Sequence, residues 1–167
     1  MNATENLLRG SFKLKEIESR SVLARFDLTT SFSGVLSIKA VLGDRATILI
    51  SMPATKRSFE LRHDQALQQI AGFEALWHLP ESGPSHRLCL DGSTFKVMLR
   101  LQGGAWVASR HEGLQRGDRM TELVLALLGL AFGVTAEQDP SLHARLKQWV
   151  AQHVECDNSL AIPKAGG

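Results

Sequence analysis

Two tight turns divide residues 86–111, HRLCLDGSTFKVMLRLQGGAWVASRH, into three short segments of alternating polarity. The middle segment shows the pattern best, with one apolar face made by Phe95, Val97, Leu99 and Leu101. This period of two is that of a half-buried β-strand. The dipeptides Asp91-Gly92 and Gly103-Gly104 supply the positive φ angles that tight hairpins need. The stretch therefore predicts an antiparallel meander of three strands.

The same period of two runs through the N-terminal part of the chain. It predicts four strands, around Phe12–Leu14, Val22–Leu28, Leu36–Leu42 and Ile48–Met52. In the second of these, one face is expected to hold Val22, Ala24, Phe26 and Leu28. Gly43-Asp44 predicts a hairpin between the third and fourth strands. Pro53 ends the fourth strand, because proline cannot donate to a central ladder, and Phe59 and Leu61 leave room for a short edge strand.

Three helices are expected, one between the sheet segments and two after them. The first has an apolar stripe with helical spacing at Ala66, Ile70, Phe73 and Trp77. We expect Asp64 as its N-cap and Pro80 as its stop. The second, Met120–Val134, is apolar nearly all round and predicts a central core helix. The third opens at Asp139-Pro140, with proline at its first position.

These elements predict an α+β fold. The order is four strands, a helix, three strands and two helices, which gives an antiparallel sheet of about seven strands in two meander segments with three helices on one face. Residues 1–156 form a single domain of this kind, and residues 157–167 are expected to be a flexible C-terminal tail. The loop Glu81–Ser85 separates the two segments, and the sequence leaves open whether they form one continuous sheet.

The composition of the chain indicates which kinds of partner and which cellular compartment to expect. The 167 residues carry a net charge of only +2, which favours neither nucleic acid nor an acidic membrane surface as a partner. The apolar run Leu123–Val134 is shorter than the roughly 20 residues of a membrane span, and Gly129 and Gly133 interrupt it. Cys89 and Cys156 form neither a CxxC pair nor a zinc pattern, and the N-terminus has no signal-peptide pattern. We therefore expect a cytoplasmic protein without a membrane partner.

Known catalytic signatures are missing from the sequence. It contains no GxxxxGK[ST], no GxGxxG after a strand, no HExxH and no GxSxG. No cofactor and no metal are therefore expected, and an enzyme is the less favoured class. The remaining catalytic candidates lie just after the meander and are His111, Glu112 and Asp118. A histidine beside carboxylates suits acid–base chemistry, but Asp118 equally suits the N-cap of the following helix.

The end of the meander is also the candidate binding surface. Strand ends and the loops after them carry function more often than the strands themselves. The candidate binding residues are Arg100, Trp106, Arg110, His111 and Arg116. Trp106 anchors a partner if it faces outward and belongs to the core if it faces inward.

The leading hypothesis is a non-enzymatic bacterial protein that acts by binding another macromolecule, as an antagonist or immunity protein, a chaperone or an adaptor. The meander resembles those of short bacterial proteins that include candidate toxin antagonists, but the same turn chemistry occurs in many unrelated meanders, so no family is assigned. The alternative is a small hydrolase or ligand-binding enzyme that uses the loop around His111, Glu112 and Asp118. The expected partner is a protein, and a homodimer is compatible with either hypothesis.

Overall fold

The computed structural model of the chain describes residues 22–30, 33–42, 45–81, 94–101, 104–110, 114 and 116–153. Its strands are β1 (Val22–Thr30), β2 (Gly34–Leu42), β3 (Ala46–Met52), β4 (Thr55–Glu60), β5 (Thr94–Leu101) and β6 (Gly104–Arg110). Its helices are α3 (His63–Leu76), α4 (Arg119–Gln138) and α5 (Pro140–His153). The strands expected around Phe12–Leu14 and His86–Leu90, both cysteines and the tail 157–167 lie outside the described residues.

The described strands form one antiparallel sheet, in the order β4-β3-β2-β1-β5-β6. The expected α+β class is confirmed, with six strands in the described ranges and β4 and β6 at the two edges of the sheet. The two sequence segments meet where β1 pairs with β5, from Ala24 opposite Leu99 to Thr29 opposite Thr94. They therefore make a single continuous sheet, which the sequence left open.

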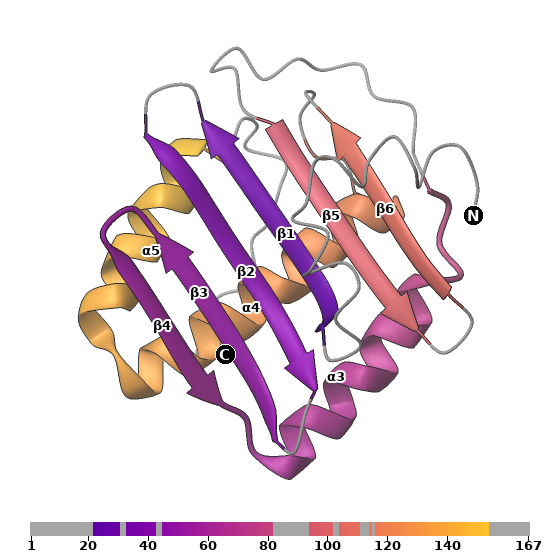
Figure 1. Cartoon of the computed structure of the whole chain (residues 1–167), viewed down its shortest axis with the longest axis horizontal. Coiled ribbons are helices and arrows are strands. Elements are labelled where there is room, and N and C mark those ends of the chain that lie inside the picture. Colours follow the sequence, from indigo (N-terminus) through magenta and orange to yellow (C-terminus); the bar gives the residue numbers. More distant parts are fainter. Residues whose placement is uncertain are drawn as a thin grey trace.

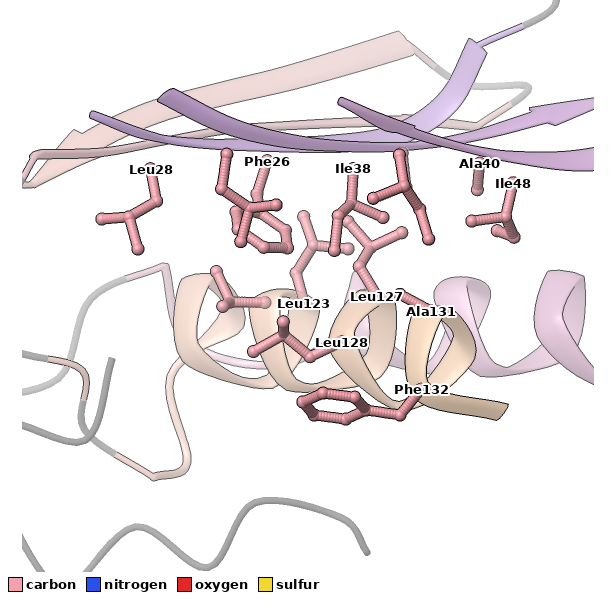
Figure 2. Close-up of a cluster of buried hydrophobic side chains, with 14 of the residues drawn as sticks. Phe26, Leu28, Ile38, Ala40, Ile48, Leu123, Leu127, Leu128, Ala131 and Phe132 are labelled. Carbon is pink, nitrogen blue, oxygen red and sulfur yellow. The ribbon is translucent and has the colours of Figure 1, made fainter. Parts of the chain in front are cut away.

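One face of the sheet carries the core. Phe26, Ile38 and Val97 lie side by side on β1, β2 and β5, and each is fully buried. Figure 2 shows the core side chains of the strands pointing from the sheet toward those of α4. This arrangement follows from the period of two, because alternate residues of each strand point to the same face.

Val22 breaks the expected pattern of β1. The register of β1 against β2 shifts between Val22 and Ala24. Such an irregularity moves a side chain to the other face of a strand. Val22 consequently packs with Met98 and Val107, in a small cluster separate from the main core. The expectation that Val22 shares a face with Phe26 is therefore wrong.

All three helices lie on the same side of the sheet (Figure 1), and two of them pack against it. The central helix α4 crosses β1, β2, β3 and β5, and both α3 and α5 pack against α4. By length and composition alone α4 is apolar enough to cross a membrane, but 61% of that stretch is buried inside the fold. It therefore serves as the core helix, as its all-round apolar sequence predicts.

The N-terminus of α3 corrects one expectation. Arg62 is the N-cap, with extended backbone, and its N–H donates to the side chain of Gln65 at 3.1 Å. Asp64 instead lies within the first turn. A carboxylate there still interacts favourably with the positive end of the helix dipole, so the acidic residue keeps a helix-start role, but two residues after the N-cap rather than at it.

Candidate functional site

At the end of the meander, Arg110 and Asp118 form a buried ion pair. Nη1 of Arg110 on β6 lies 2.8 Å from Oδ2 of Asp118, and the two side chains are 10% and 0% exposed. The other carboxylate oxygen of Asp118 accepts a hydrogen bond from the Thr121 N–H at 2.7 Å, which caps α4. Both oxygens of this carboxylate therefore hold the fold together.

Next to this pair, Arg119 joins α4 to α3 and β6. Its guanidinium carbon lies 5.2 Å from the ring centre of Trp77 and 5.0 Å from that of Trp106. Its Nη2 donates to the carbonyl oxygens of Trp77 at 2.6 Å and Leu79 at 3.1 Å. Cation–π contacts and charge-assisted hydrogen bonds are stronger when they are shielded from water. Trp106 thus lies on the helix side of the sheet, partly buried against Arg119.

Of the remaining candidates, Arg100 lies on the other face of the sheet from Trp106. Arg100 is opposite Ala105 in the β5–β6 ladder, so its side chain points to the face away from the helices. Arg116 is 54% exposed in side chain and bonds Glu122 at 2.8 Å. His111 and Glu112 lie outside the described residues. The structure therefore brings Arg110 and Asp118 together, and places Arg100 and Arg116 elsewhere.

A larger feature lies between two helices. An open groove of about 590 Å³ runs between α3 and α4, and we call it the α3–α4 groove. This volume lies within the range of about 300–1,000 Å³ that is usual for binding sites. Most of its apolar lining is made by Leu61, Phe73, Leu76, Leu125, Ala126, Leu130 and Val134.

The polar groups of the groove are few and mostly neutral. Gln65, Gln68 and Gln69 line the α3 side, and the Nε2 of Gln69 is buried with no hydrogen-bond partner. The charged lining residues are Arg116 and Glu122, which pair with each other. Across the described parts of the chain, no group of three His, Cys, Asp or Glu side chains is placed to hold a metal ion. The groove therefore suits an uncharged, largely apolar occupant.

Three glycines also line the groove, Gly72 on α3 and Gly129 and Gly133 on α4. A methyl group added at Gly72 or Gly133 would have no atom within 4 Å, and neither residue has a positive φ. Glycine inside a helix costs about 1 kcal/mol relative to alanine. Neither packing nor backbone geometry in the described structure accounts for glycine at these two positions.

Sequence reasoning used Gly129 and Gly133 only as interruptions of an apolar run. Their spacing of four residues places them on one face of the helix, and Ala126 extends that face by three residues. This pattern of small residues was the available signal for the α4 wall. The α3 wall has no such signal, because nothing local indicates that Gly72 faces α4.

The chain matches no protein-family model, and the search of curated proteins found no match.

Proposed function

We propose that the protein is not an enzyme and acts by binding another protein in the α3–α4 groove. The observation that carries the proposal is the groove itself, about 590 Å³ with a mainly apolar lining, which the described parts of the chain leave open between two helices. Apolar surface left uncovered in this way is a common mark of a binding site.

The composition of the groove supports binding rather than chemistry. Acid–base or nucleophilic catalysis needs a titratable or nucleophilic side chain with a free reacting atom. The ionisable lining residues are Arg116 and Glu122, which form an ion pair, and Oε1 of Glu122 accepts from both Arg116 and the Gly117 N–H, so this carboxylate helps to hold the segment before α4. Glutamine supplies hydrogen bonds without charge, which suits the rim of a protein interface.

The enzyme alternative centres on His111, Glu112 and Asp118 and stays a prediction. The position of Asp118 weighs against it, since the carboxylate is fully buried and bonded to Arg110 and the Thr121 N–H. Proton transfer by Asp118 would break the ion pair and weaken the cap of α4. The carboxylate is better suited to holding β6 against α4 than to general acid–base work.

Site-specific photo-crosslinking tests the proposal. A benzophenone amino acid replaces Gln68, an exposed residue that lines the groove, in the full chain expressed in its native cells. The matched control replaces Ala71, which is exposed on the same helix and is not part of the lining. We expect one discrete protein adduct from position 68 and none from position 71. Equal crosslinking from both positions, or none from position 68, would overturn the proposal.

A further inference from the structure

We infer that the occupant of the α3–α4 groove is an amphipathic helix of the partner, about three turns long, with an uncharged apolar stripe. The inference rests on the proposed function and specifies the partner's chemistry. Four features of the groove support it: the length of its walls, the hydrogen bonding of their backbones, the glycines in the lining and the charge of the lining.

The length of the groove sets the length of the occupant. The lining runs from Gln65 to Leu76 along α3 and from Glu122 to Val134 along α4. At about 1.5 Å rise per residue, each wall is about 18 Å long, which is a little over three turns. A partner helix of the same length lies along both walls and contacts them through residues spaced i, i+3, i+4 and i+7.

Backbone chemistry favours a helix over an extended segment. Both walls are helices, and the interior N–H and C=O groups of a helix bond within the helix. An extended peptide laid in this groove would therefore find few partners for its own backbone, and each unpaired buried group is costly. The neutral donors and acceptors on the α3 side are three glutamine side chains. The backbone groups of a helical occupant are already hydrogen-bonded within that helix and need no partners from the groove.

The glycines point to a close backbone approach. Small residues at a helix interface let two helix backbones come close together. Gly129 and Gly133 are four residues apart on α4, and Gly72 faces the groove from α3. The free energy lost by placing glycine in a helix is offset if a partner helix packs directly on these positions.

The charge of the lining defines the partner's stripe. A charged side chain inserted between Leu125 and Phe73 would be buried without a counter-charge, because Arg116 and Glu122 already pair with each other. The buried Nε2 of Gln69 has a hydrogen to donate. We therefore expect an apolar stripe with one neutral acceptor, such as a serine, threonine, asparagine or glutamine, opposite Gln69.

A second copy of the chain is a poorer occupant. A two-fold dimer needs a patch that complements itself, and a groove is not complementary to a groove. Among the side chains whose burial the structure describes, the large apolar ones that are exposed are Val35 and Leu42, and both lie on β2 rather than on a helix. The described surface thus offers no apolar helix face for insertion into the groove of another copy.

Two displayed peptide libraries test the inference on the full chain. Both contain 18-residue peptides of the same composition, one with apolar residues at helical spacing and the other with strict alternation. We expect enrichment from the helical library only, with uncharged anchor positions. The enriched peptides should bind the variants Gly133→Leu and Gly72→Leu about tenfold more weakly or worse, and bind Ala136→Leu unchanged, since Ala136 is exposed on α4 outside the lining.

Three results would overturn the inference. They are enrichment from the alternating library, no enrichment from either library, and enriched peptides that bind Gly133→Leu and Gly72→Leu as tightly as the native chain. Thermal unfolding of each variant confirms that it is folded. The test also separates this inference from the proposed function. A natural partner crosslinked at Gln68 through an extended segment would contradict the helical occupant while the proposed function stands. Helical peptides that bind, without any natural adduct at position 68, would contradict the proposed function while the preference of the groove for a helix stands.

Discussion

Arg110 and Asp118 are eight residues apart in sequence and form an ion pair of 2.8 Å that is almost completely buried. The pair fastens the last strand of the sheet, β6, to the first turn of the core helix α4. Charges buried in this way are costly when one partner is lost, because the other stays in a poorly solvated place. The residues expected to bind a partner or to catalyse at this end of the meander therefore include two that stabilise the fold.

Removal of the Asp118 carboxylate should destabilise the protein strongly. We expect Asp118→Ala to lower the free energy of unfolding by about 3–5 kcal/mol, because Arg110 loses its counter-charge and α4 loses its cap. Urea denaturation measures this value. The matched control is Glu60→Ala, whose partner Arg45 is mostly exposed and which should cost at most about 1 kcal/mol. Equal losses in the two variants would contradict the structural role of the buried pair.

Arg119 should not be replaceable by lysine. A lysine has no planar fork to lie between Trp77 and Trp106 while donating to two carbonyl groups. We expect Arg119→Lys to cost about 1–3 kcal/mol of unfolding free energy and to change the tryptophan emission spectrum. The same substitution at the exposed Arg45 should be nearly neutral. An unchanged emission spectrum in Arg119→Lys would show that the two rings do not depend on the guanidinium.

Two glycines should respond in opposite directions to substitution by alanine. Gly133→Ala should raise the free energy of unfolding by up to about 1 kcal/mol, because the added methyl group meets no atom within 4 Å. Gly34→Ala should lower it by about 1–3 kcal/mol, since Gly34 has a φ of +90° and a Cβ there would lie 2.9 Å from Pro53 Cγ. Thermal and urea unfolding of both variants show whether each substitution raises or lowers the free energy of unfolding. A destabilising Gly133→Ala would mean that Gly133 has a packing role within the chain.

The two faces of β2 should differ in their tolerance of truncation. Ile38 is fully buried between the sheet and α4, whereas Val35 is 43% exposed on the opposite face. We expect Ile38→Ala to cost about 2–5 kcal/mol and Val35→Ala to cost less than about 0.5 kcal/mol. Similar values for the two variants would contradict the assignment of the faces.

Local patterns predicted the elements of this fold, and long-range contacts explain what they missed. The alternation through Phe95 and Val97 predicted β5 correctly, because each side chain's face follows from its place in the strand. The pairing of Ala24 with Leu99 joins residues far apart in the chain, and no local signal specifies it. The Asp118 cap was one of two interpretations of a short motif, and the hydrogen bond from the Thr121 N–H to its carboxylate shows the cap.

The same division applies to the candidate site. The spacing of Gly129 and Gly133 was visible in the sequence, but a face of small residues on one helix forms a groove only when a second helix lies beside it. The second helix is α3, which lies much earlier in the sequence than α4, so no local pattern predicts that the two are neighbours. Trp106 could be placed on a strand from sequence, while its contact with Arg119 depends on the packing of α4 beneath the sheet.

The most direct measurement compares stability and binding in the single variant Gly133→Leu. Leucine favours a helix more than glycine does, and a Cβ at this position meets no atom within 4 Å. We predict a midpoint of thermal unfolding equal to or above that of the native chain, together with loss of the photo-crosslinked adduct from position 68. An adduct of undiminished yield in a well-folded Gly133→Leu protein would contradict binding in the α3–α4 groove.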